Sequence, residues 1–300
     1  MTEFNPSQLA RMDPVRLATY RTNLNFYQGN HWPTTSRHRQ LVFNYAKVSV
    51  DKITSFLMQG LTFACYPEED TDQLKARART AEQILRHVYE YNNLQQLDYE
   101  TEIDAAVLGD GCYKVIWDVD EKRIRVTSPD VSGIYAWWLG DDASRVWRVA
   151  SRYPLTQDEV QLLYNLSIDK KTATLTEVWT SRDFQLYLDS DLIDSKPNPY
   201  GFIPFVIFPN LREPKKFWGS SDIPSLVQPQ RELNRALSQL SRILELSGNP
   251  IAVLENIASA EDIKVQPGAL WTIPEDAKAY LLDLLQGGGV RLHVDYIDLL

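Results

Sequence analysis

Residues that could carry out catalysis occur throughout the sequence, but they do not form a recognised catalytic motif. The phosphate-loop pattern Gly-x-x-x-x-Gly-Lys and the dinucleotide pattern Gly-x-Gly-x-x-Gly are both absent. Gly109-Asp110-Gly111 has the composition of a hairpin turn, and no nucleophile-elbow motif positions a serine for a catalytic triad. We therefore predict no catalytic residues and no enzymatic activity.

The potential metal ligands have equally simple structural explanations. Asp189-Ser190-Asp191 resembles the start of a calcium loop, but Ile193 stands where an oxygen ligand is needed. Asp118 and Asp120 fit a polar turn. The histidines have neither a His-x-x-x-His partner nor a cysteine neighbour; they are His31, His38, His87 and His293. We predict no metal site and no cofactor.

Three arginines have a spacing that could serve a charged surface. Arg231, Arg235 and Arg242 follow one another at four- and seven-residue steps and would lie on one broad face of a helix. Three interpretations remain open at this point: a solvated face balanced by Glu232 and Glu245, salt bridges between subunits, or contacts with DNA phosphates.

The helix that must position these arginines is the longest one that the sequence predicts. Gly219-Ser220-Ser221-Asp222 offers N-cap chemistry, and Pro229 marks a restart or kink before a run that ends at about Ser247. From Pro229 onward such a helix would be about 28 Å long at 1.5 Å per residue. Its apolar stripe would be core in a monomer but would pack on neighbouring copies in a ring; it consists of Leu233, Leu237, Leu240 and Leu244.

The composition is that of a large folded protein outside the membrane. The chain has 300 residues, of which 44% are hydrophobic, so it can bury a sizeable core. Its longest apolar runs, such as 203–209, are far short of the roughly 20 residues that span a bilayer. No secretory signal opens the sequence, and Cys65 and Cys112 do not form a disulfide framework, which fits reduced thiols in an intracellular setting.

The charge balance limits how the protein can bind nucleic acid. Forty Asp and Glu against 31 Lys and Arg give a net charge of -9. Affinity for DNA comes mainly from cations that displace counterions from phosphates, so tight general binding is not expected. A surface past which DNA slides remains compatible with this charge.

The first third of the chain predicts helices. Glycines or capping residues frame most of them, and in the second helix Val48, Ile53 and Leu57 are expected to form the buried side. The predicted helices are 8–28, 44–60, 71–92 and 94–108.

The middle of the chain changes to a period of two and predicts strands, so the fold class is α+β. A short helix opens with the capping-box pattern Thr156-Gln157-Asp158-Glu159. Pro204 favours an edge position for the last strand of this region. The predicted strands are 113–117, 123–127, 145–152, 174–180, 184–188 and 202–208.

Beyond the long helix, a small β-containing unit is predicted. Its short apolar runs are 251–254, 263–265 and 270–273, and Gly287-Gly288-Gly289 closes it. Val290, Val294, Ile297 and Leu300 then keep helical spacing with no cap or breaker, so we expect the natural polypeptide to continue past residue 300.

The order of these segments resembles the portal proteins of tailed bacteriophages. The opening helices match at 20–30 and 44–52, the central hairpin at 109–115 with Ser128-Pro129, and the approach to the long helix at 198–205. The strongest match leads from the glycine-serine segment into the long helix and past its end, at Gly219, Ser221, Asp222, Asn234 and Pro250.

This resemblance implies a domain organisation. It divides the chain into a wing domain at 1–222, a stem helix at 223–248, a small α/β clip domain at 249–286, and the start of a second stem helix at 287–300. The rest of that helix, the channel loop, the returning part of the wing and any crown would lie outside this sequence.

The resemblance also implies a function. The chain would be a structural subunit of a dodecameric ring at one capsid vertex of the virion. The ring would assemble in the host cytoplasm, and no membrane would be among its partners. Double-stranded DNA would pass through the ring irrespective of its sequence, and the ring would contact terminase, capsid protein and neck or adaptor proteins. The residues expected to face the channel or DNA are Arg231, Arg235, Arg242, Lys264 and Arg291.

Two other functions are considered. A phage morphogenesis enzyme, such as a nuclease or protease, would need a catalytic constellation, and a metal-dependent activity assay would reveal it. A head–tail adaptor is a nearer alternative, but adaptors are usually small and lack a stem with an inserted clip.

Overall fold

The computed structural model describes residues 4–32, 40–58, 60–248, 252–256, 275–281 and 294–298. The chain divides into two compact units. Unit 1 comprises Met1–Asn30 and Tyr45–Leu226, and unit 2 comprises His31–Asn44 and Val227–Leu300. The mixture of helices and antiparallel sheets agrees with the predicted α+β class.

Unit 1 begins with helices that are shorter than predicted. The single helix expected over 8–28 is interrupted at Asp13, whose φ of -131° and ψ of 51° are not helical. The cause is Pro14, which has no N–H and disfavours a helical conformation in the residue before it. Gly29, expected to follow the end of this helix, has a φ of +92°. The resulting elements are η1 (Pro6–Gln8), α1 (Leu9–Met12) and α2 (Pro14–Tyr27).

The next three helices lie close to their predicted positions. Thr71 caps the second of them through its side chain, and Gly109 ends the third. They are α3 (Tyr45–Leu57), α4 (Asp72–Tyr91) and α5 (Leu94–Leu108).

The buried face of α3 is not the predicted one. Val48, Ile53 and Leu57 are each more than half exposed, whereas Ala46, Val50 and Thr54 are buried. Because α3 has apolar residues on more than one side, periodicity alone did not identify which side the chain covers.

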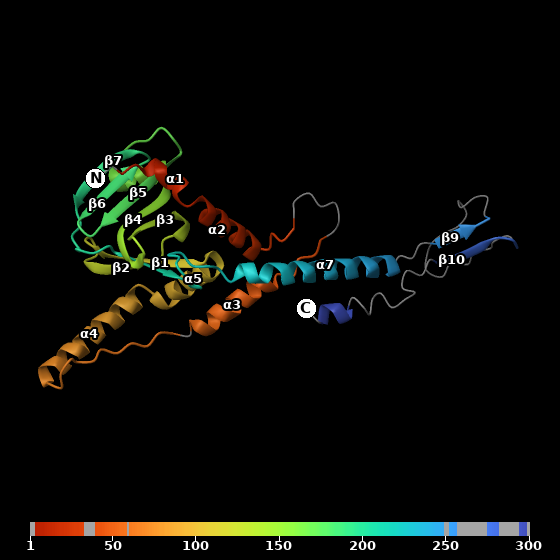
Figure 1. Cartoon of the computed structure of the whole chain (residues 1–300), viewed down its shortest axis with the longest axis horizontal. Helices are drawn as coiled ribbons and strands as arrows, with labels where there is room; N and C mark the ends of the chain where they lie inside the picture. The colour runs from red at the N-terminus through yellow and green to blue at the C-terminus, as the bar shows by residue number, and fades with distance from the viewer. Residues whose placement is uncertain are drawn as a thin grey trace. The chain divides into compact units, whose positions relative to one another are not determined.

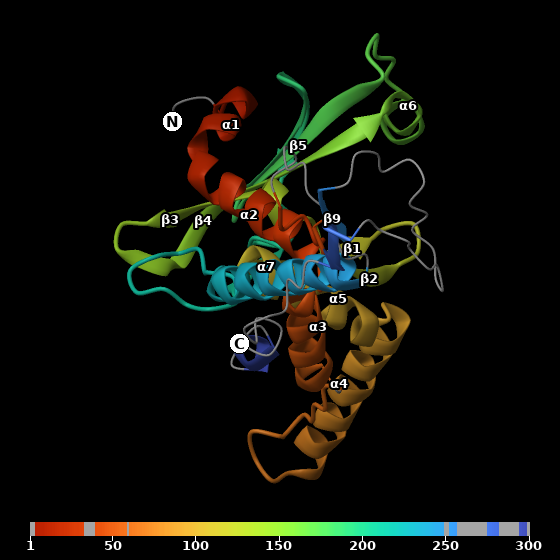
Figure 2. The same ribbon diagram turned by 90° about the vertical axis from the view of Figure 1, so that its right-hand side faces the viewer.

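A five-stranded antiparallel sheet forms the centre of unit 1, in the order β3-β4-β5-β6-β7. Both faces are buried. Val178 packs with Leu9 of α1 on one face, while Leu175 and Trp179 pack with Val160 on the other. Figure 2 shows α1 and α2 lying across this sheet. The strands are β3 (Ile134–Leu139), β4 (Asp142–Thr156), β5 (Thr172–Thr180), β6 (Asp183–Leu188) and β7 (Asp191–Pro197).

Two short helices accompany this sheet. In α6 (Gln157–Tyr164), both bonds of the predicted capping box are present: Glu159 N–H donates to the Thr156 hydroxyl, and Thr156 N–H donates to the Glu159 carboxylate. A 3-10 turn, η2 (Val131–Gly133), precedes β3.

A second, three-stranded antiparallel sheet has the order β2-β1-β8. The predicted hairpin is formed by β1 (Asp110–Asp118) and β2 (Arg123–Thr127), and β8 (Phe205–Pro209) takes the edge position expected from Pro204.

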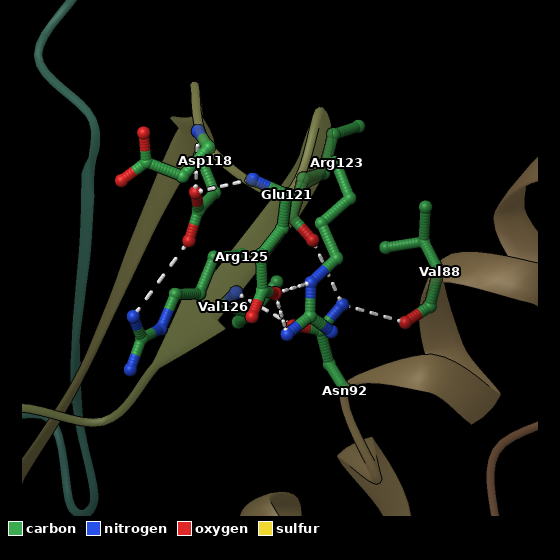
Figure 3. A network of polar contacts seen from close by, with 9 residues as sticks. Val88, Asn92, Asp118, Glu121, Arg123, Arg125 and Val126 are labelled. Carbon is green, nitrogen blue, oxygen red and sulfur yellow. Dashed lines mark hydrogen bonds and ion pairs between the residues drawn. The ribbon is translucent and has the colours of Figure 1, made fainter.

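The end of α4 is attached to this sheet through Asn92 (Figure 3). Its amide donates to the carbonyls of Val88 and Ile124 over 2.8 and 3.1 Å, and its carbonyl accepts from Val126 N–H over 3.0 Å. Asn92 therefore satisfies backbone groups on the outer edge of β2. The Arg123 guanidinium also lies 3.9 Å from the centre of the Tyr91 ring.

Unit 2 is organised around α7 (Ile223–Gly248), which begins in the last residues of unit 1 (Figure 1). The restart expected at Pro229 does not occur, because Pro229 lies inside this continuous helix. Beyond it, β9 (Ala252–Glu255) pairs with β10 (Lys278–Leu281), and residues 294–298 are helical. The expected strand at 251–254 thus agrees with β9, while those at 263–265 and 270–273 lie outside the described residues. Within the described part of the chain, none of the helices combines the length and apolarity required to cross a membrane.

Candidate functional site: the origin and polar face of helix α7

The start of α7 is bonded to the end of α5. Asp222 N–H donates to the Ala106 carbonyl over 3.0 Å, and the Ser221 hydroxyl donates to the same carbonyl over 2.8 Å. Ser221 also accepts from Ile223 N–H over 3.0 Å, so its side chain satisfies the first N–H group of α7. One carbonyl in the last turn of α5 thereby accepts two hydrogen bonds from the segment directly before α7. The last carbonyls of a helix have no partner within the helix, so these bonds supply one.

A buried carboxylate holds this segment from the other side. Asp110, which is fully buried, accepts a hydrogen bond from Gly219 N–H over 2.8 Å and another from the Tyr20 hydroxyl. Burial raises the pKa of Asp110, although the two hydrogen bonds and the charge of Arg16 oppose that shift. Burial and the neighbouring Asp110 also raise the pKa of Tyr20, so its hydroxyl remains protonated and donates.

Arg16 connects this carboxylate to the large sheet. Its guanidinium donates to the carbonyls of Ile134 and Val131 over 2.8 and 3.3 Å, and it lies 3.8 Å from the centre of the Trp218 ring. Arg16 also donates to the Tyr20 hydroxyl over 3.3 Å. Helix α2, strand β3 and the segment before α7 therefore meet at one buried polar cluster.

Two glycines allow the backbones at this junction to approach closely. Gly109 has a φ of +120°, a conformation that residues with a side chain rarely adopt. A Cβ atom at Gly219 would lie 2.6 Å from the Gly109 carbonyl oxygen and 2.6 Å from the Pro209 Cβ atom. We name this set, Gly109, Asp110, Gly219, Ser221 and Asp222, the α5–α7 junction.

Our interpretation of Gly109-Asp110-Gly111 as a hairpin turn was wrong. Gly109 follows the end of α5, and Asp110 and Gly111 are the first residues of β1. The turn of the β1–β2 hairpin follows Asp118, where the sequence also predicted a polar turn, and the Asp118 carboxylate accepts from the N–H groups of Asp120 and Glu121. The sequence could not reveal the role of Asp110, because its partners are 90 and 109 residues away.

In unit 2, polar side chains of α7 bind the segment 41–43. Asn234 is fully buried, and its carbonyl oxygen accepts from Phe43 N–H over 3.0 Å and from Gln230 over 3.1 Å. Gln230 in turn donates to the Phe43 carbonyl over 2.6 Å. One turn later, Ser238 accepts from Leu41 N–H over 3.0 Å. These side chains of α7 form hydrogen bonds with the backbone N–H and carbonyl groups of residues 41–43, which would otherwise need a neighbouring strand.

The same contacts determine the protonation state of His31. A backbone N–H can only donate, so the Asn234 oxygen faces Phe43 and the Asn234 amide nitrogen faces His31 Nδ1 at 2.8 Å. His31 Nδ1 must accept this bond, which requires an imidazole without a proton on that nitrogen. His31, which the sequence analysis considered only as one of four scattered histidines, is 3% exposed.

The predicted arginines are exposed on α7 wherever the structure describes them. Arg235 forms an ion pair with Glu232 at 2.6 Å, as expected for a balanced solvated face, and Arg231 and Arg242 are exposed. Lys264 and Arg291 lie outside the described residues, as does Pro250.

The predicted leucine stripe is partly covered. Leu233, Leu237 and Leu240 are half-buried, and Leu244 is 55% exposed. The stripe is therefore neither core nor fully exposed surface in a single chain.

The candidate metal ligands are found in turns. Asp189 has a φ of +54° and accepts from Thr174 N–H over 2.9 Å, as a turn residue would. Among the residues that the structure describes, no three His, Cys, Asp or Glu side chains converge as a metal site would require. His38 and His293 lie outside those residues.

The arrangement is that of a mixed α/β body from which a long helix begins at a buried polar junction. A family model described as "Phage portal protein, SPP1 Gp6-like" matches residues 8–289, nearly the whole chain. The chain therefore belongs to this phage portal protein family, a structural family of the capsid and its head–tail connector. None of the curated proteins matches the sequence.

Proposed function

We propose that this protein forms the portal ring at one capsid vertex, through which double-stranded DNA enters during packaging and leaves during ejection. The match to the portal family over 8–289 carries this proposal. The ring would be dodecameric, would dock terminase during packaging and neck proteins afterwards, and would assemble in the host cytoplasm before becoming part of the virion.

In this proposal, residues 1–222 form the wing, 223–248 the stem, 249–286 the clip, and 287–300 the start of a second stem helix. The continuous helix α7 supports the assignment of the stem, and the β9–β10 pair supports a small separate clip. The α5–α7 junction would fix the origin of the stem in the wing, because it bonds the segment directly before α7 on two sides.

The charge supports a conduit and not a clamp. With a net charge of -9 and Arg235 already paired with Glu232, the protein has little capacity to neutralise phosphates. Since binding to phosphates increases with the number of cations in contact, a weakly attractive or repulsive wall would let DNA slide.

Electron microscopy of the protein produced from its complete gene tests the proposal. Closed rings with a central hole and twelvefold symmetry are expected. Protein that remains monomeric at high concentration would contradict it. A small adaptor-like assembly without a projecting stem would favour the head–tail adaptor, and metal-dependent nuclease or protease activity would favour a morphogenesis enzyme.

A further inference from the structure

Unit 1 contains an open groove of about 730 Å³ between the β3–β4 end of the large sheet and β8. Its volume is within the range of sites that hold ligands or peptide side chains. Much of its wall is apolar and unusually exposed: Phe202 is 59% exposed, Val206 56% and Trp147 39%. Exposed apolar surface of this kind marks interaction sites.

The walls of the groove are held in place by packing and hydrogen bonds. Phe217 stacks on Trp138 with ring centres 4.7 Å apart. On the opposite wall, the buried Asn198 amide donates to the carbonyls of Thr180 and Phe202 over 2.7 and 2.8 Å. The groove is thus a formed feature of the fold.

The groove also has unbalanced positive charge. Arg145 and Arg212 both line it and are exposed. Neither arginine has an ion-pair partner within the described part of the chain. The charge of Arg145 does contribute to lowering the pKa of the exposed Asp142 carboxyl, after that group's hydrogen bonds with Ser144. An occupant should therefore combine an aromatic or aliphatic side chain with carboxylates.

The segment between α3 and α4 has this chemistry. Tyr66 is 87% exposed, and Pro67, Glu68, Glu69 and Asp70 follow it. Asp70 pairs with Lys75, whereas Glu68 and Glu69 are exposed and have no ion-pair partner among the residues described.

The conformation of this segment keeps Tyr66 exposed. Phe63 packs against Tyr89 of α4 with ring centres 5.8 Å apart, and Cys65 N–H donates to Glu82 over 3.3 Å. Alternate residues of the extended segment therefore face α4, and Tyr66 faces away. Figures 1 and 2 show that this segment runs beside α4 to the end of α4 that is far from the sheets. It therefore lies away from the β3–β4 hairpin, which borders the groove.

We propose that Tyr66, Glu68 and Glu69 of one subunit bind in this groove on a second copy of the chain, with Tyr66 against the apolar wall and the carboxylates facing Arg145 and Arg212. The inference rests on the proposed ring. Because the donor segment and the groove are different surfaces of one subunit, the contact is head-to-tail, the type that repeats around a closed ring. An aromatic anchor surrounded by complementary charges is a common basis for a specific interface.

Disulfide cross-linking tests the contact directly. In a Cys65→Ser background, Tyr66→Cys is combined with Val206→Cys, and assembled protein is oxidised and separated without reductant. A ladder of covalent multimers is expected, because a disulfide requires the two Cα atoms to lie within about 7 Å. Each single cysteine, and a pair of Val206→Cys with Leu162→Cys on the exposed side of α6, should give no ladder.

Charge exchange provides an independent measurement. Glu68→Arg with Glu69→Arg, and separately Arg145→Glu with Arg212→Glu, should each raise the concentration for half-assembly about tenfold through like-charge repulsion. All four substitutions together should restore assembly to within about twofold of the unmodified protein. Lys122→Glu with Lys171→Glu reverses two exposed charges elsewhere and should leave assembly unchanged.

The outcomes separate this contact from the ring itself. If the unmodified protein forms rings, but the charge variants assemble normally and no ladder forms, the inference is overturned and the portal proposal remains. The groove would then bind a different protein or none. If the unmodified protein forms no rings, the proposed function is contradicted, and the groove contact that rests on it is contradicted as well.

Discussion

The Asp110 carboxylate accepts a hydrogen bond from Gly219 N–H over 2.8 Å, although the two residues are 109 positions apart. This bond joins the start of β1 to the segment that begins α7. Since Asp110 is fully buried and also accepts from Tyr20, it satisfies two donors that water cannot reach.

Asp110→Ala should destabilise the protein substantially. The Gly219 N–H and the Tyr20 hydroxyl would both lose their acceptor inside the fold, and Arg16 would lose a nearby negative charge, at a cost of about 2–5 kcal/mol. Urea unfolding followed by tryptophan fluorescence measures this loss. Asp110→Asn retains one acceptor and should lose less, and Asp120→Ala in the exposed turn should change stability by less than about 0.5 kcal/mol.

Gly219→Ala should disturb the same junction by overlap. The added Cβ atom would lie 2.6 Å from the Gly109 carbonyl oxygen, and backbone atoms cannot move aside cheaply. A destabilisation of about 1–3 kcal/mol is expected, typical of overpacking. Ser220→Ala is the matched control in the adjacent position, where only backbone atoms form hydrogen bonds to Leu211. Equal stability of the two variants in urea would show that the close approach is not required.

Local signals in the sequence predicted local structure well. The predicted ranges 94–108 and 123–127 agree with α5 and β2, and the capping box of α6 formed as its pattern indicated. Strands β3 and β7 were missed for opposite reasons. The apolar run of β3 is buried on both faces and does not alternate, whereas β7 is a polar edge strand.

Features that depend on distant partners were not predictable in the same way. The glycine-serine segment was correctly predicted to precede a long helix, but the carboxylate that binds it was taken for a turn residue. On α3, the pattern showed apolar residues on several sides, and the predicted face is the exposed one. A single sequence gives no means to distinguish a face that the chain covers from one that it leaves open.

Lys114 and Glu177 form a buried ion pair between the two sheets, with a separation of 2.6 Å. Tyr153 and Trp179 also donate to the Glu177 carboxylate. Glu177→Gln should cost about 3–5 kcal/mol at neutral pH, because it leaves the Lys114 charge without its counterion. Thermal unfolding measures the effect, and Glu90→Gln on the exposed side of α4 should leave the unfolding temperature nearly unchanged.

The same pair predicts a pH dependence. Burial opposes ionisation of Glu177, but the charge of Lys114 and the hydrogen bonds outweigh burial and hold the pKa of Glu177 below its usual range. The stabilisation is therefore fully present above the unfolded-state pKa of about 4.3 and is lost as the pH falls below it. The difference in unfolding temperature between the unmodified protein and Glu177→Gln should shrink as the pH falls from 6 to 3. A constant difference would contradict the assigned direction.

DNA association should be weak, sensitive to salt and independent of sequence. With a net charge of -9, few phosphates can be neutralised, so affinity for duplex DNA at physiological salt should be weaker than about 1 µM. Fluorescence anisotropy with several unrelated duplexes at increasing salt measures both properties. Replacing Arg231, Arg235 and Arg242 by alanine should reduce the salt slope if these residues contact phosphates. Nanomolar affinity for one defined duplex would exclude a passive channel.

Leu237→Asp and Leu240→Asp should each abolish ring assembly while the wing stays folded. Both leucines are half-buried on α7, and Leu244, one turn beyond Leu240, is 55% exposed, so the stripe has surface left for a neighbouring subunit. Loss of buried leucine packing costs about 2–5 kcal/mol even for truncation to alanine, and a buried carboxylate without a partner adds to this.

Arg235→Ala removes an exposed ion pair with Glu232 that contributes less than about 1 kcal/mol, so it should impair assembly much less. Every subunit of a ring repeats the same defect, and light scattering should therefore show free subunits for the aspartate variants and rings for Arg235→Ala. Circular dichroism would verify that the wing remains folded. Rings that persist with either aspartate would show that the leucine stripe is not a subunit contact and that α7 is not the stem.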